Sequence, residues 1–102
     1  MKTMNTDDLA QRNAQAGHHW FSPGTLRFFR SRISATAYVR ADGLRAYFVS
    51  SEQREGDRRR YSVRVADLTT GRVGTEGKFQ AYGSRKSADG AALSAALWKA
   101  AA

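Results

Sequence analysis

The chain has 102 residues, of which 41% are hydrophobic, and its 17 Lys and Arg against nine Asp and Glu give a formal net charge of +8. This length predicts a single domain with a modest core, which excludes general disorder. The sequence contains no cysteine, so disulfides and thiolate metal sites are excluded and a reducing cytoplasm is favoured. No run approaches the ~20 apolar residues of a membrane span, and we expect a cytoplasmic protein that does not bind membranes.

Residues 6–16 predict a short helix with little apolar surface. Thr6 is placed to cap it, two aspartates follow in its first turn, and Gly17 is a typical C-terminal stop. Its apolar side is little more than Leu9 and two alanines. We therefore expect a weakly ordered helical segment at 1–17, followed by one compact α+β domain at 18–102.

A second helix start lies at Ser22 and Pro23, because serine favours the N-cap and proline the first helical position. Leu26 and Phe29 then follow at helical spacing. We predict a short helix over 23–31 that docks through its aromatic side chains.

From residue 33 to residue 82 the hydrophobic period is two, which is typical of β-strands. Alternation predicts successive strands over 35–40, 44–50, 61–66 and 73–82, and a turn signal such as Ala41-Asp42-Gly43 separates neighbouring strands. Short strands joined by tight turns indicate an antiparallel meander.

The last segment, 85–101, predicts an alanine-rich helix that Ser84 caps. Leu93 and Leu97 lie on one of its faces, and we expect them to pack on the apolar face of the sheet. The predicted fold is therefore α+β. It has a small antiparallel meander sheet of three to four strands, a C-terminal helix packed on one face and short N-terminal helices, and the other face of the sheet is expected to be open.

Basic and aromatic side chains alternate with the apolar ones along the predicted strands. If they share the open face, arginines can bond guanine edges or phosphates, and tyrosines can stack on unpaired bases. A solvated face or a protein interface accounts for the same pattern, because outward strand positions are polar and tyrosine favours strands. The residues placed on this face are Tyr38, Arg40, Arg45, Tyr47, Arg64, Arg72 and Lys78.

Two further basic clusters flank the predicted sheet. Arg27, Arg30 and Arg32 follow the helix start at Ser22, and both a phosphate site and a solvated helix face fit this pattern. The arginine run at 58–60 follows three acids that partly neutralise it, so a solvated loop is favoured over a flexible phosphate clamp.

The sequence offers no catalytic or metal-binding set. His18 and His19 are its only histidines, and adjacent residues rarely point the same way. No third ligand or nucleophile completes a zinc site or a triad with them, and the scattered glycines form no phosphate loop. We expect a protein that is not an enzyme and that needs no cofactor or metal.

Three stretches are similar to a family of small uncharacterised phage- and plasmid-encoded proteins: HHWFSPGTLRFFRSR at 18–32, YFVSSEQ at 47–53 and GKFQAYGSR at 77–85. The resemblance implies a mobile-element origin and a compact domain, and it implies no activity. The sheet and final helix are also similar in outline to integrase arm-binding domains, which bind DNA with an open sheet face. The family motif positions are Pro23, Thr25, Arg27, Phe28, Phe29, Ser31, Arg32, Phe79, Tyr82, Ser84 and Arg85.

The leading hypothesis is a non-catalytic nucleic-acid-binding module of a mobile genetic element, with DNA as the expected partner. The alternative is a phage- or plasmid-encoded inhibitor or adaptor that binds a host protein, such as a defence complex. The sequence leaves open whether the protein is a monomer or a homodimer. The residues expected to contact nucleic acid are Arg40, Arg45, Tyr47, Arg64, Arg72 and Lys78 on the sheet, with Arg27, Arg30 and Arg32 at its margin.

Overall fold

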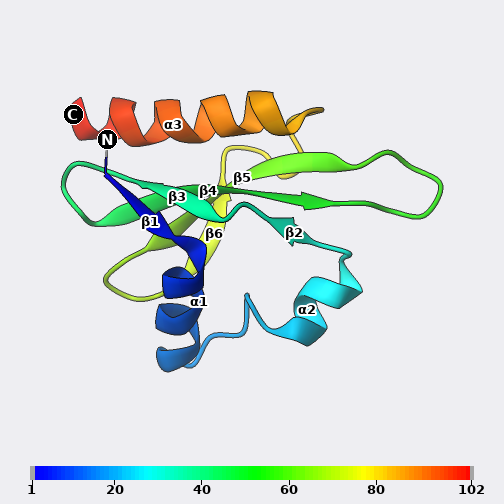
Figure 1. The fold of residues 1–102 in the computed structure, drawn as a ribbon, viewed down its shortest axis with the longest axis horizontal. Helices are drawn as coiled ribbons and strands as arrows, with labels where there is room; N and C mark the ends of the chain where they lie inside the picture. Colours follow the sequence, from blue (N-terminus) through cyan, green and yellow to red (C-terminus); the bar gives the residue numbers. More distant parts are fainter. Residues whose placement is uncertain (1, 102) are drawn as a thin grey trace.

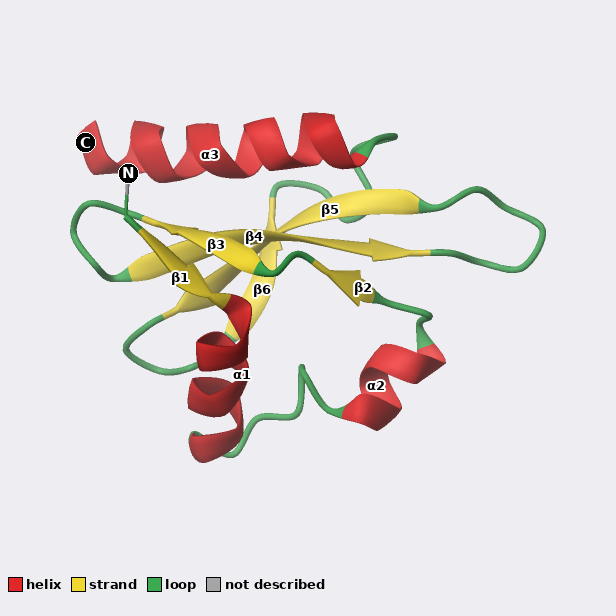
Figure 2. Cartoon of the chain, in the orientation of Figure 1, coloured by secondary structure: helices red, strands yellow, loops and turns green. Residues whose placement is uncertain are grey.

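A computed structural model describes residues 2–101 and places the side chains of residues 2–97. The chain forms a six-stranded antiparallel sheet, with α3 along one face and α1 and α2 on the other side (Figures 1 and 2). The elements in chain order are β1 (Thr3–Asn5), α1 (Thr6–Gln15), α2 (Pro23–Phe28), β2 (Arg32–Ile33), β3 (Thr36–Val39), β4 (Arg45–Glu52), β5 (Arg60–Asp67), β6 (Val73–Glu76) and α3 (Arg85–Ala101).

The sheet has six strands rather than the three to four that the sequence predicted. The strand order is β1-β3-β4-β5-β6, and β2 pairs with β4 on the same edge as β3, further along that strand. The prediction missed β1 and β2 because they are only three and two residues long, too short for alternation to be visible. The α+β class, the antiparallel pairing and the C-terminal helix are confirmed.

The N-terminal segment packs against the sheet. β1 pairs with β3, and Leu9 of α1 lies in the core with 2% of its surface exposed. Asn13 of α1 is also buried, and its Nδ2 donates to the carbonyl of Gly71 at 2.8 Å. The segment has few apolar residues, but its buried polar contacts tie it to the turn between β5 and β6.

The residue that caps α1 is Asn5, whose Oδ1 accepts from the N–H of Asp7 at 2.9 Å. Thr6, the predicted cap, is buried instead, and its hydroxyl donates to the carbonyl of Ser34 at 2.7 Å. The predicted stop is confirmed, because Gly17 follows the helix with a φ of +83°.

The α2 helix begins as predicted, with Ser22 as an N-cap that accepts from the N–H of Thr25 at 3.3 Å. It ends at Phe28 rather than at residue 31. The chain leaves the helical region at Arg30, which has a φ of +49°. The predicted aromatic docking of this helix was wrong, because Phe28 is 80% exposed and Phe29 is 50% exposed.

Small side chains form the interface between α3 and the sheet. Alanines at four-residue spacing share one face of the helix and allow it to lie close to the strands. Leu97, which we expected to pack on the sheet, is 55% exposed. The buried residues of this core are Tyr47, Val49, Val63, Ala88, Ala92 and Ala96.

The opposite face of the sheet is also covered, which corrects the prediction of an open face. Trp20 and Phe21, in the loop between α1 and α2, pack on Phe48 with ring centroids 5.6 and 5.8 Å from it. As a result, seven successive residues of β4, 46–52, are buried. The buried residues of this second core are Leu9, Ala37, Val39, Ala46, Phe48 and Ala66.

The register between β4 and β5 explains why the predicted face does not exist. Phe48 lies opposite Arg64, and Tyr47 lies opposite Val65. Directly paired residues share a face of the sheet, so Arg64 faces the α1 and α2 side while Tyr47 faces α3. Alternation shows which residues of one strand share a face, but it does not show which of these sets lies on the same face as a given set of the neighbouring strand.

Candidate anion-binding site

The nine residues predicted to contact nucleic acid do not form one surface. Tyr47 is fully buried beneath α3, and Arg64 is 8% exposed on the opposite face. Arg40 and Arg45 lie at the β3–β4 hairpin, where Arg40 pairs with Asp42 at 2.6 Å. The remaining exposed members are Arg27 on α2, Arg30 before β2, Arg32 on β2, and Arg72 and Lys78 on either side of β6.

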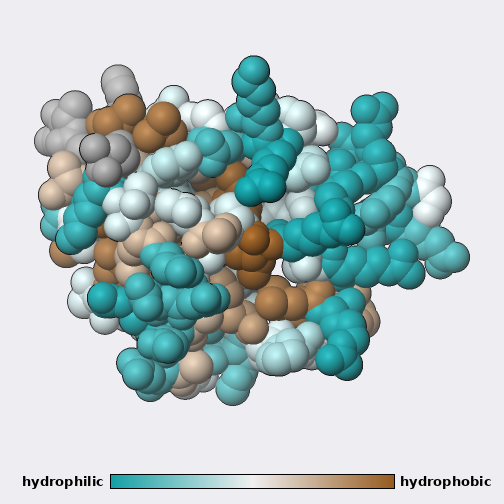
Figure 3. Space-filling model, in the orientation of Figure 1, coloured by the Kyte–Doolittle hydropathy of each residue, from teal (hydrophilic) through white to brown (hydrophobic). Residues whose placement is uncertain are grey.

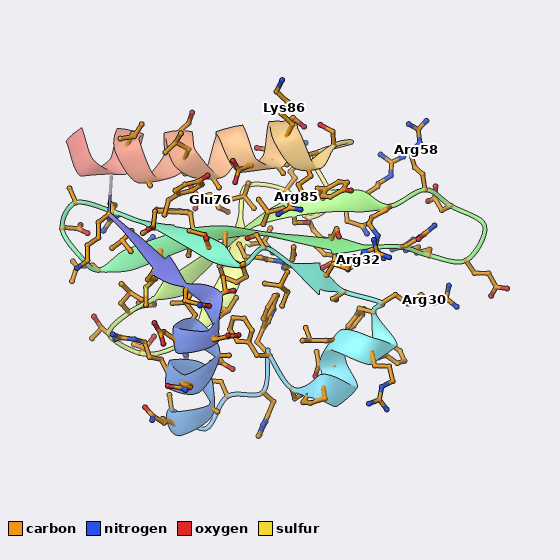
Figure 4. The ribbon with its side chains drawn as sticks, in the orientation of Figure 1. Arg30, Arg32, Arg58, Glu76, Arg85 and Lys86 are labelled. Atoms are coloured by element: carbon orange, nitrogen blue, oxygen red, sulfur yellow. The ribbon has the colours of Figure 1, made fainter. Side chains whose placement is uncertain are left out.

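Three segments that are distant in sequence meet where the β4–β5 hairpin approaches β2 and the start of α3 (Figure 4). We call this region, formed by residues 30–32, 53–60 and 84–87, the basic side. It carries eight Lys and Arg and only two Asp and Glu, so most of the net charge of the chain resides there. Figure 3 shows hydrophilic side chains over the β4–β5 end of the molecule.

A pocket on the basic side is lined by arginines from three elements, and we call it the arginine pocket. Arg32 comes from β2, Arg59 from the hairpin loop directly before β5, and Arg85 from the first residue of α3. Tyr61 and two serines of the wall add hydroxyl groups. Guanidinium and hydroxyl donors that converge from several elements are suited to the oxygens of a phosphate.

The backbone holds Arg59 in place. Its Nη1 donates to the carbonyl oxygens of Arg30 and Ser51 at 3.1 and 3.0 Å, and to Ser51 Oγ at 2.8 Å. These hydrogen bonds use one nitrogen of the guanidinium, and none among the described residues uses its Nε or Nη2. An oriented guanidinium with N–H groups to spare loses little freedom when it binds an anion.

No carboxylate neutralises the arginine pocket within the part of the chain that has described side chains. Ion pairs there join only Arg40 to Asp42 and Arg64 to Glu52. The like charges around the pocket repel one another, and an anion would convert that repulsion into attraction.

The start of α3 adds to the positive field. Ser84 caps this helix as predicted, since its Oγ accepts from the N–H of Ser87 at 3.2 Å. The first turn contains Arg85 and Lys86 and no acid, although the positive end of a helix dipole disfavours each cation by about 0.3–1 kcal/mol. A bound anion would reverse this penalty.

Part of this site was not predicted from the sequence. Arg85 was given only as a family motif position and Lys86 was not singled out, although two cations in the first turn of a capped helix are an unusual arrangement. The arginine run at 58–60 was discounted because acids precede it. Of those acids, Glu52 points into the protein, where it forms an ion pair with Arg64.

A second pocket lies on the α1 and α2 side of the sheet, and we call it the aromatic pocket. Its walls include Trp20, Leu26, Phe29 and Phe79, and its floor contains the buried pair of Glu52 and Arg64. Glu52 follows directly after Ser51 on β4, and Ser51 lines the arginine pocket. The two pockets therefore open on opposite faces of the same strand end.

Arg64 is the centre of the polar network in the aromatic pocket. It donates from Nη2 to Glu52 Oε1 at 3.0 Å, from Nε to Ser50 Oγ at 2.7 Å, and from Nη1 to Thr75 Oγ1. The guanidinium also lies 5.3 Å from the ring centroid of Trp20 and 5.0 Å from that of Phe79, which is within cation–π range.

The comparisons with known proteins support a family and no activity. The model of a family of unknown function, DUF7447, matches residues 5–93. The chain belongs to this family. Neither the curated proteins nor the solved structures give a match to this DUF7447 domain.

Two features are absent from the described residues of this DUF7447 protein. No group of three or more His, Cys, Asp and Glu is placed to hold a metal ion among them. No helix in the described part is long and apolar enough to cross a membrane.

Proposed function

We propose that this DUF7447 protein is a non-catalytic nucleic-acid-binding module, with DNA as the expected partner, and that it holds the phosphate backbone on its basic side. The observation that carries the proposal is the arginine pocket, where Arg32, Arg59 and Arg85 converge from three elements without a described carboxylate partner. The proposed surface replaces the open sheet face expected from the sequence, and it retains Arg30 and Arg32 from the predicted site.

The spread of charge favours a polymer over a single phosphate. The eight cations of the basic side extend from the hairpin loop to the first turn of α3, a larger surface than one pocket. A nucleic acid offers successive phosphates to such a surface, and each neutralised phosphate releases counterions. Binding is therefore expected to weaken steeply as salt increases.

The test is fluorescence anisotropy with labelled DNA, single-stranded and duplex, between about 50 and 300 mM salt. In the pocket variant, Arg32→Gln with Arg85→Gln, two exposed guanidiniums are removed. The control variant, Arg45→Gln with Arg72→Gln, removes the same charge from exposed positions outside the basic side. We expect the pocket variant to bind more weakly, with a log–log salt slope smaller by about 1 for each lost phosphate contact.

Two results would overturn the proposal. One is the absence of binding by the unaltered protein even at the lowest salt. The other is an equal loss of affinity in the pocket and control variants, because net charge alone would then account for the attraction.

We also propose that the protein works in the cytoplasm and originates from a phage or plasmid. The motif over residues 18–32 supports this origin through its resemblance to proteins of mobile elements. The absence of cysteine favours a reducing compartment. Genes adjacent to those of several family members would show whether they lie in mobile elements.

A second candidate function is binding to a host protein, as an inhibitor or adaptor. The observation that favours it is Phe28, which exposes 80% of its surface on α2 and packs edge-to-face on Phe29 at 4.8 Å. Exposed aromatic side chains are common at protein interfaces. A tagged pull-down from nuclease-treated lysate separates the two functions, because a stoichiometric protein that survives the nuclease favours this one.

A further inference from the structure

The aromatic pocket combines apolar walls with a polar floor. Its volume of about 250 Å³ lies just below the range of about 300–1,000 Å³ typical of sites for drug-sized ligands. Phe29 and Phe79 are 50% and 49% exposed, so their rings form the rim of the pocket and remain accessible. The size and the ring-lined walls are suited to one flat aromatic group.

The floor of the pocket contains an acceptor without a donor. Glu52 is 6% exposed, and its Oε1 accepts from Arg64 and from Ser50 Oγ. Its Oε2 is buried and has no hydrogen-bond partner among the described residues. A buried acceptor without a donor is unfavourable. The oxygen has almost no accessible surface, so a ligand with an N–H group would gain a hydrogen bond to it if the Glu52 side chain rotates toward the pocket.

Cations lie next to this pocket. An adjoining cavity shares Phe29, Glu52 and Phe79 with it and adds Arg30 and Arg54 to its lining. The carbonyl of Arg30 also accepts from Arg59 of the arginine pocket. The chain of contacts therefore runs from the aromatic rings, through Arg30, to the phosphate site of the proposed function.

We propose that the aromatic pocket binds one unpaired nucleobase, which contacts the rings of Phe29 and Phe79 and donates an N–H to Glu52 Oε2. This inference rests on the proposed function, because the basic side supplies the contacts to the backbone. Every nucleobase has a π-face for stacking, and unpaired bases expose the N–H groups that duplex pairing uses. The protein is therefore expected to prefer single-stranded DNA to duplex DNA.

The test compares three DNA probes of equal length and label in the anisotropy assay: a single strand of mixed sequence, a duplex, and a strand of abasic sites. The variants are Phe29→Ala and Phe79→Leu, and the latter retains apolar volume while it removes the ring. The control is Leu44→Ala, since Leu44 is 51% exposed in the β3–β4 hairpin and does not line the pocket. Thermal melting confirms that each variant is folded.

We expect the unaltered protein to bind the mixed single strand most tightly. Phe29→Ala and Phe79→Leu should each weaken this binding by about tenfold, which is within the range measured for base–aromatic stacking. They should not weaken binding to the abasic strand or change the salt slope. The Leu44→Ala control should bind like the unaltered protein.

Three results would overturn the proposal that the aromatic pocket binds a base. Equal binding of all three probes, with unchanged binding by both ring variants, would contradict it and leave the proposed function intact. Equal losses on the mixed and abasic strands would show that the rings act without a base. A dimer that both ring variants disrupt, with unchanged DNA binding, would show that a second copy of the chain occupies the pocket. Failure of all probes to bind at low salt would instead refute the proposed function itself.

Discussion

Arg64 and Glu52 form an ion pair inside the protein, with Nη2 and Oε1 separated by 3.0 Å and the two side chains only 10% and 7% exposed. Further hydrogen bonds, from Nε to Ser50 and from Nη1 to Thr75, involve the other two nitrogens of the guanidinium. A buried charge of this kind is tolerated only while its partner is present.

Glu52→Gln is therefore expected to lower the free energy of unfolding by about 3 kcal/mol, because it leaves the guanidinium buried without a counter-charge. Urea denaturation measures the change. The double variant Glu52→Leu with Arg64→Met should be more stable than Glu52→Gln, because it removes both charges and keeps apolar volume. The matched control is Asp42→Asn in the more exposed pair with Arg40, which should change stability little. Equal effects of the two single substitutions would contradict this.

The hydroxyl of Tyr38 connects the sheet to α3. It lies 3.0 and 2.9 Å from the two carboxylate oxygens of Asp89. Tyr38→Phe removes this hydrogen bond and is expected to cost about 1 kcal/mol at neutral pH. Urea denaturation at pH 7 measures the loss, and an unchanged midpoint would show that the bond contributes nothing net.

The same contact predicts a loss of stability in alkali. The hydrogen bond to Asp89, together with partial burial and the carboxylate charge, raises the pKa of Tyr38 above its ordinary value. In the unfolded chain tyrosine ionises near pH 10, so the contribution is complete below that pH and disappears as pH rises toward the folded pKa. The free energy of unfolding should fall less between pH 9 and 11, roughly the window around that ionisation, in Tyr38→Phe than in the unaltered protein.

Asp67 predicts the opposite trend in acid. Its Oδ1 accepts from the backbone N–H groups of Thr69 and Thr70 at 2.8 and 3.1 Å. The hydrogen bond from Thr70, followed by the one from Thr69, is the main reason that the pKa of the Asp67 carboxyl is lowered. The unfolded residue titrates near pH 4, so its contribution is complete above that pH and is lost as pH falls through the lower folded value.

Asp67→Asn keeps an oxygen acceptor in the turn and removes the titration. Its free energy of unfolding should therefore decrease less than that of the unaltered protein as pH falls below about 4. Urea titrations at several acidic pH values provide the comparison. If the free energy of unfolding depends on pH in the same way in both proteins, the turn does not stabilise the charged form of Asp67 over the neutral form.

Gly71 and Gly43 allow a matched test of how closely α1 packs. Both residues have positive φ, +77° and +73°, so alanine is strained at each. Only at Gly71 would a Cβ atom lie 2.7 Å from the carbonyl oxygen of Arg12, whereas at Gly43 the space is open. Gly71→Ala should therefore lower the melting temperature more than Gly43→Ala. Equal shifts in melting temperature would show that α1 can move away from the added methyl group without loss of stability.

Local sequence signals predicted most of the elements of this fold. The Ser22 and Ser84 caps, the turn at Gly43 and the alternation along β4 and β5 are decided by neighbouring residues, and the structure contains each of them. The faces could not be predicted in the same way. Tyrosine and arginine have both polar and apolar parts, so the pattern does not show that Tyr47 and Arg64 are buried.

The candidate site was only partly predictable for a related reason. Arg32, Arg59 and Arg85 are separated by 27 and 26 residues in the sequence, by their numbering, and only the pairing of β2 with β4 and the return of α3 bring them together. No local pattern contains this information. The three acids before the arginine run also led us to discount it, although Glu52, one of the three, is buried at the end of β4 and does not lie in the exposed loop.

The contact between Asn13 and Gly71 also has a consequence for the order of folding. These residues are 58 positions apart, and Tyr38 and Asp89 are 51 apart. Contacts between residues so far apart in the sequence slow folding, because much of the chain has to be ordered before they form. During synthesis, α1 cannot reach its place until the turn after β5 has left the ribosome, and the sheet keeps one face bare until α3 follows. The domain is therefore expected to fold late and as a whole, rather than in stages from its N-terminus.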